Sequence, residues 1–93
     1  MKKSILQNEK ECFITGSHEN LHFHHIYFGA GRRKISDENG FGVYLRADWH
    51  NMADYGVHFN KSLDLSLKQI CQKKYEETHT REEFIAIVGK SYL

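Results

Sequence analysis

The sequence predicts an α+β domain, and three observations support this fold class. Residues 21–28 are rich in aromatic and β-branched side chains, which is typical of a strand. A second apolar stretch, 41–45, follows the dipeptide Asn39-Gly40, a common turn between antiparallel strands. Apolar residues later in the chain recur instead at helical spacing. Because the chain has only 93 residues, we expect these elements to share one core.

The elements before the helical region can be assigned in order. Residues 1–11 are polar, and we expect them to form an N-terminal arm or a short helical turn. Residues 29–40, between the two strands, contain glycines and basic side chains and are predicted to be a loop. After the second strand, 47–54 has the length and composition of a short helix that closes near Gly56. The predicted order is therefore a β-hairpin followed by a short helix.

Two longer helices are predicted in the last part of the chain. Over 61–76, leucines and other apolar residues give an approximate apolar stripe. A further helix is expected to begin at Thr80, because Thr80 and Glu83 have the spacing of a capping box. Gly89 is well suited to end it. We expect 61–93 to be a helical extension of the same domain.

The composition excludes several classes of protein. With 40% hydrophobic and 27% charged residues, the chain is too apolar to be disordered. Its longest apolar run, 84–88, is too short to span a membrane. The first residues lack the apolar region of a signal peptide, so a cytoplasmic location is expected. A net charge of +1 indicates no bulk attraction to nucleic acid.

Histidine is abundant, with seven in 93 residues, and several fall on the predicted hairpin and short helix. Strand alternation places His22 and His24 on one face and His25 on the other. His50 lies in the predicted short helix, and His58 follows eight residues later. The strand–loop–strand–helix order brings a histidine of the first strand close to one of the helix. Neutral imidazoles placed in this way are typical metal ligands.

A family resemblance rests on the same residues. The double histidine His24-His25 is followed 25 residues later by the pair His50-Asn51. Three further segments add to it: Arg-Lys-Ile-Ser, Gly-Val-His-Phe-Asn and Glu-Thr-His-Thr-Arg-Glu-Glu-Phe, at 33–36, 56–60 and 77–84. Over about residues 12–93, this pattern resembles the HNH endonuclease family, and most closely its small phage-type members.

The resemblance implies a fold and an activity. Residues 12–60 would form a ββα-metal core of a hairpin and a short helix, followed by the two C-terminal helices. The implied enzyme cuts phosphodiester bonds in DNA with one divalent metal ion. We expect Mg²⁺ or Mn²⁺ as the working metal, with Zn²⁺ or Ni²⁺ as alternatives. A nuclease of this size that cuts both strands would act as a homodimer or in two encounters.

The resemblance also implies a role for each histidine. His24 and His50 would be metal ligands, and His25 would be the general base that takes a proton from water. His58 would be the third ligand. Asp54 competes for that role, because on a helix it would lie one turn beyond His50, on the same face.

Other residues receive supporting roles from the resemblance. The asparagine that supports the base has two candidates, Asn39 beside the second strand and Asn51 after His50. Arg32, Arg33 and Lys34, on the predicted loop, are expected to neutralise DNA phosphates. Such contacts contribute affinity and salt dependence but do not select a base sequence.

Many HNH proteins also hold a structural zinc ion through two Cys-Xaa-Xaa-Cys pairs. At the first position this chain has Cys12 and Thr15, and at the second it has Arg46 and Trp49. One of four ligands is present. Because a single thiolate cannot hold a tetrahedral zinc ion, no structural zinc is expected.

Two alternative functions compete with the nuclease. The chain could be a catalytically degenerate HNH scaffold that binds DNA or a phage or host protein without cleaving. It could also be a structural metal-binding module whose fold depends on zinc, in which case chelation would unfold it. The complete set of histidines favours the nuclease, because a protein that only binds would have little reason to retain it.

Overall fold

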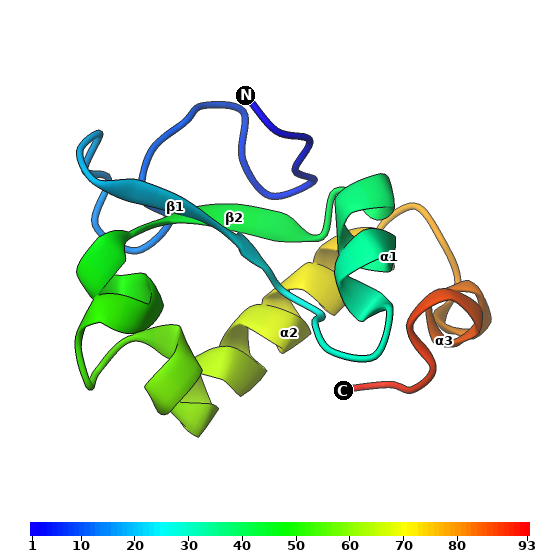
Figure 1. Ribbon diagram of the computed structural model, residues 1–93. Helices are drawn as coiled ribbons and strands as arrows, with labels where there is room; N and C mark the ends of the chain where they lie inside the picture. The colour runs from blue at the N-terminus through cyan, green and yellow to red at the C-terminus, as the bar shows by residue number, and fades with distance from the viewer.

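Two short antiparallel strands form the sheet, in agreement with the predicted α+β class (Figure 1). In the computed structural model, which describes residues 1–93, β1 spans Leu21–His25 and β2 spans Gly42–Arg46. His24 pairs with Val43, and His25 pairs with Gly42 at the end of β1. The register therefore places the double histidine where the first strand leaves the sheet.

Gly42 is required by the close packing at this end of the hairpin. A Cβ atom on Gly42 would lie 2.3 Å from Cζ of Phe23, much closer than side-chain atoms approach. The Phe23 ring thus occupies the space that any other residue at position 42 would need. Because Gly42 has no side chain, the Phe23 ring can pack over the position where Gly42 pairs with His25.

The prediction of a loop over 29–40 is wrong, because α1 forms an α-helix over Arg32–Asn39. Gly40 follows it with φ of 72°, and its N–H donates to the carbonyl of Ser36. The Asn39-Gly40 dipeptide therefore marks the end of a helix instead of a hairpin turn. The first strand is also shorter than predicted and ends at His25. Beyond it the chain leaves the sheet, and the N–H of Tyr27 donates to Oγ of Ser36 at 3.1 Å instead of to the second strand.

The short helix predicted over 47–54 is observed as one turn only, and a second, separate turn follows it. The first, η1, is one π-helical turn over Asp48–Met52, and it ends where Ala53 becomes extended. The second, η2, is a 3₁₀ turn over Val57–Phe59. His50 and His58 consequently lie on two different elements.

Both predicted C-terminal helices are confirmed to within about one residue. Helix α2 spans Lys61–Tyr75, and the side chain of Asn60 accepts the N–H of Leu63 at its start. Helix α3 spans Arg81–Val88 and begins with the predicted capping box of Thr80 and Glu83. No helix is long and apolar enough to cross a membrane.

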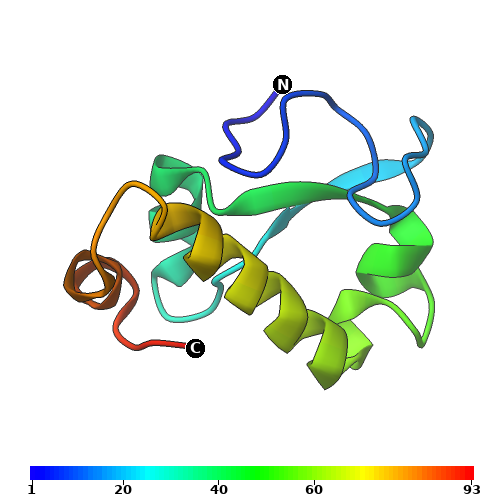
Figure 2. The same ribbon diagram turned by 180° about the vertical axis from the view of Figure 1, so that it is seen from behind.

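The elements surround the hairpin on several sides. Helix α2 runs along one side of it, η1 and η2 lie at one end, and α1 and α3 lie at the other (Figures 1 and 2). Apolar side chains from strand β2, from the segment that directly follows β1 and from helices α2 and α3 form the core, including Val43, Leu45, Leu67, Phe84 and Val88. This packing gives the histidine-bearing elements a fixed support.

The N-terminal segment 1–11 contains neither helix nor strand and lies on the side of the hairpin opposite α2 (Figure 1). It is attached through hydrogen bonds. The N–H of Ile5 donates to the carbonyl of Gly40 at 2.9 Å, and the N–H of Tyr44 donates to Oε1 of Gln7 at 2.7 Å. The segment therefore satisfies backbone groups at the outer edge of β2.

Candidate metal centre

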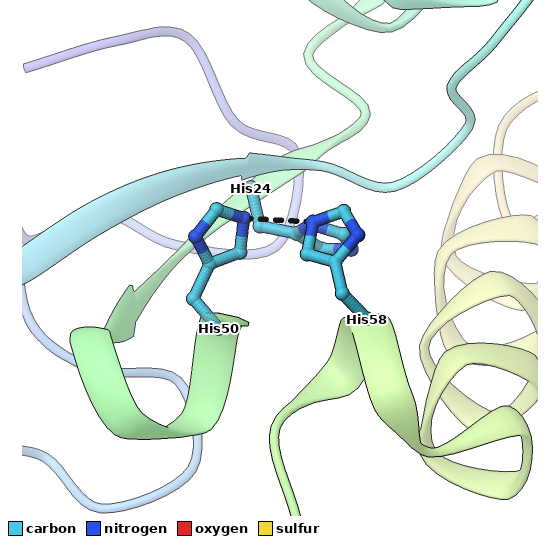
Figure 3. A group of neighbouring side chains, drawn as sticks. All are labelled: His24, His50 and His58. Atoms are coloured by element: carbon cyan, nitrogen blue, oxygen red, sulfur yellow. Dashed lines mark hydrogen bonds between the residues drawn. The ribbon is translucent and has the colours of Figure 1, made fainter. Parts of the chain in front are cut away.

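Three histidines from three different elements converge beside strand β1 of the hairpin. His24 comes from β1, His50 from η1 and His58 from η2, and their rings point toward one another (Figure 3). Each offers a ligand nitrogen, and these nitrogens lie within 4.8 Å of one another. Nε2 of His58 is 3.0 Å from Nε2 of His50. The structure thus brings together the three histidines predicted as ligands.

Gly56 allows the second turn to approach the first. A Cβ atom on Gly56 would lie 2.8 Å from the carbonyl oxygens of both Asp48 and His50. The backbone at position 56 therefore packs directly against the backbone of η1. Since His58 follows two residues later, this contact places His58 beside His50.

Burial keeps two of the three imidazoles of the cluster, those of His24 and His50, neutral at pH 7. His24 is only 1% exposed, and burial lowers its pKa to about 3, with further contributions from His50 and His58. Burial also lowers the pKa of His50 to about 4, and neighbouring His58 adds to the effect. A neutral imidazole retains the lone pair that a metal ion requires.

The donor set fits a divalent metal ion. Nε2 of His24 is buried and has no hydrogen-bond partner, which is unusual for a buried polar atom and suits a ligand. Zn²⁺ binds imidazole nitrogens at about 2.0–2.1 Å, so tetrahedral ligands lie roughly 3.4 Å apart. The nitrogens of His50 and His58 lie 3.0 Å apart and all three ligand nitrogens lie within 4.8 Å of one another, so small movements of the rings would bring them to this spacing. Three protein ligands leave a coordination position open, as in catalytic metal sites.

Asp54 and Asn51 are not part of this cluster. Both are exposed, and both line a separate hollow together with Met52, Ala53 and Phe59. The helix on which Asp54 would follow His50 by one turn ends at Met52, so the side chains do not share a face. The amide of Asn39, the other asparagine candidate, donates to the carbonyl of Ile35 within α1.

His25 borders the same hollow as the cluster. This hollow has a volume of about 210 Å³ and is lined by Phe23, His24, His25, Phe28, Arg33, His50 and His58. Alternation predicts opposite faces for His24 and His25. Both nevertheless border the hollow at the place where β1 ends.

Asp37 is a partner of His25 that sequence reasoning missed. Nε2 of His25 lies 3.2 Å from Oδ1 of Asp37, and the His25 side chain is 11% exposed. Asp37 belongs to α1, the segment predicted as a loop. Only the fold of that segment as a helix shows which of its carboxylates reaches the histidine.

The three basic residues of the same segment differ in their position. Arg33 lines the hollow, so it faces the site. Lys34 is exposed and pairs with Glu38 at 3.9 Å on the surface of α1. Arg32 lies near Gly89 at the end of α3. Among the predicted phosphate contacts, Arg33 is the one that borders the histidines.

Comparison with known proteins identifies no relative, because no family model, no curated protein and no solved structure matches this chain. The chemistry of the site is therefore inferred from its own residues. They provide three converging imidazoles, a fourth histidine held by a carboxylate, and one guanidinium, around a single hollow.

Proposed function

We propose that the protein is a metal-dependent endonuclease or nickase that hydrolyses phosphodiester bonds in DNA. The observation that carries this proposal is the position of His25, which is paired with Asp37 and borders the same hollow as the three-histidine cluster. Hydrolysis of a phosphodiester requires a base for water and an electrophile for the phosphate. In this arrangement, both functions would face one space.

His24, His50 and His58 would hold one divalent metal ion, with the cluster as the counterpart of the metal site in a ββα-metal core. Mg²⁺ or Mn²⁺ would be the working metal, and Zn²⁺ or Ni²⁺ would bind to the same imidazoles. When bound, such an ion polarises the phosphate and stabilises negative charge on the departing oxygen. Because the buried His24 is already neutral, it could bind the ion without first losing a proton.

His25 would be the general base. If its Nε2–H donates to Asp37, the lone pair remains on Nδ1 and can accept a proton from water. The water oxygen then forms a bond to phosphorus while the bond from phosphorus to the 3′ oxygen breaks. The proton stays on His25, and the 3′ oxygen acquires its proton from solvent. Asp37 acts as a positioning residue that orients the ring and stabilises its charged form.

Arg33 would bind the phosphate group. Its guanidinium lines the hollow, and a guanidinium can donate two parallel hydrogen bonds to phosphate oxygens. This contact is independent of base sequence, so it would position DNA without selecting a site. A local positive charge of this kind compensates for the low net charge of the chain, +1.

A plasmid-nicking assay with Mn²⁺ tests the base. His25→Ala should reduce the nicking rate at least about 100-fold, because general-base catalysis contributes that much or more. Metal binding and folding should be unchanged, since the three-histidine cluster is retained. The matched control is His18→Ala, because His18 is exposed and its hydrogen-bond partner is the carbonyl of Lys10, away from the site.

Two results would decide against this account. Nicking by His25→Ala at the wild-type rate would show that another group activates water. A folded, metal-loaded wild-type protein that cleaves nothing would favour the alternative, a catalytically degenerate scaffold that binds DNA or a protein. A pull-down for partners would then be the next experiment.

A further inference from the structure

His22 contacts the metal cluster from outside. It lies on β1 two residues before His24, and it is half-buried. Its Nδ1 is 2.9 Å from Nδ1 of His50, within hydrogen-bonding distance. Because residues i and i+2 of a strand share one face, His22 and His24 both face η1, which carries His50.

The His50 ring lies close to both of these side chains. Its centroid is 5.1 Å from that of His22 and 5.3 Å from that of His24, and the planes of His22 and His50 are perpendicular. The opposite nitrogen of His50, Nε2, is 3.0 Å from Nε2 of His58. The two nitrogens of His50 thus face different partners: Nδ1 faces His22, and Nε2 faces the cluster.

This geometry couples the hydrogen bond to metal binding. A neutral imidazole carries one proton, on either Nδ1 or Nε2. If the proton is on Nδ1 of His50, it is donated to His22, and the lone pair on Nε2 faces the cluster. The reverse arrangement, with His22 as the donor, would place the proton on Nε2 and block ligation. Only the first arrangement makes His50 a ligand.

We propose that His22 is a positioning residue for the metal centre, accepting the Nδ1–H of His50 and so fixing its tautomer and ring orientation. This inference rests on the metal site of the proposed function. Metal-binding histidines generally donate their second N–H to a carboxylate, a backbone carbonyl or water. Here an imidazole takes that place.

Zn²⁺ titration of chelated protein, in competition with a chromophoric chelator, tests the proposal. His22→Leu fills similar space without an acceptor and should weaken Zn²⁺ binding by about 10- to 100-fold. His22→Asn places an amide oxygen near the position of Nδ1, and it should bind Zn²⁺ with close to wild-type affinity. His18→Leu, which removes an exposed histidine elsewhere, should have no effect. Thermal unfolding in chelator checks that each variant folds.

A spectroscopic measurement separates positioning from simple packing. In the Zn²⁺-loaded wild type, proton–nitrogen correlation spectra should show the His50 proton on Nδ1 and the His22 proton on Nε2. A proton on Nε2 of His50, or wild-type Zn²⁺ affinity in His22→Leu, would overturn the role of His22 while leaving the cluster in place. A wild-type protein that binds no Zn²⁺ would overturn the metal centre itself, and the role of His22 with it.

Discussion

Replacement of Gly56 by alanine tests how the metal centre is assembled. The added carbon would lie 2.8 Å from the carbonyl oxygens of Asp48 and His50. Both contacts are with backbone, so no side-chain rotation relieves them. Position 56 has φ of −65° and ψ of 159°, which alanine adopts without strain. The effect of Gly56→Ala therefore reports the close approach of the two turns alone.

The size of the effect follows from these distances. Ordinary contacts of a Cβ atom begin at 3.4 Å, so η2 must move away from η1 by about 0.6 Å. Overpacking of this kind costs about 1–3 kcal/mol, and each kcal/mol lowers Tm by roughly 4–8 °C in a domain of this size. Metal sites tolerate about 0.2 Å in ligand distance. Displacement of His58 should therefore weaken Zn²⁺ binding at least about tenfold.

The assay is Tm in chelator together with Zn²⁺ affinity, and the control is Gly16→Ala. Gly16 has φ of 78° and no atom within 4 Å of an added Cβ, so this substitution introduces backbone strain without a clash. It should lower Tm through a cost of about 1–2 kcal/mol and leave Zn²⁺ affinity unchanged. Wild-type Zn²⁺ affinity in Gly56→Ala would refute the argument that this glycine sets the position of His58.

Three further predictions concern the base, the buried ligand and the metal. Asp37→Asn should slow plasmid nicking at least about tenfold without changing Zn²⁺ affinity, because the amide cannot stabilise protonated His25. An equal loss of nicking rate and Zn²⁺ affinity would show that Asp37 has a general structural role. Burial lowers the pKa of His24 from 6.5 to about 3, so between these values the unfolded chain binds a proton that the native chain does not. The free energy of unfolding in chelator, measured with urea, should therefore fall by about 2 kcal/mol from pH 7 to pH 5 through His24 alone, and a flat profile would contradict its burial as a neutral group. Chelation should leave the far-ultraviolet circular dichroism spectrum native at 25 °C, since the apolar core is independent of the cluster; unfolding would instead indicate a structural metal-binding module.

Local signals predict much of the fold. The capping box at Thr80 and Glu83 and the apolar spacing of 61–76 identify both C-terminal helices, because these patterns depend on residues within one or two turns. The Asn39-Gly40 dipeptide is ambiguous for a physical reason. Glycine with positive φ is favoured both in a tight hairpin turn and after the last turn of a helix, and here it follows a helix.

The candidate site is less accessible from sequence. The order of the predicted elements brings a histidine of the first strand close to one of the short helix, and the resemblance to HNH endonucleases implies His24, His50 and His58 as the ligands. The partners Asp37 and His22 are not predictable in the same way. Asp37 reaches His25 only because α1 is a helix, and His22 reaches His50 only because η1 packs across the strand. These contacts depend on how distant elements pack together.

The most direct measurement is nicking of supercoiled plasmid by the chelated wild-type protein, with Mg²⁺, Mn²⁺, Zn²⁺ or Ni²⁺ added back one at a time. The account predicts no nicking in chelator and its return with at least one metal, most strongly with Mg²⁺ or Mn²⁺. Nicking that persists in chelator, or no nicking with any metal by folded protein that binds it, would contradict a metal-dependent nuclease.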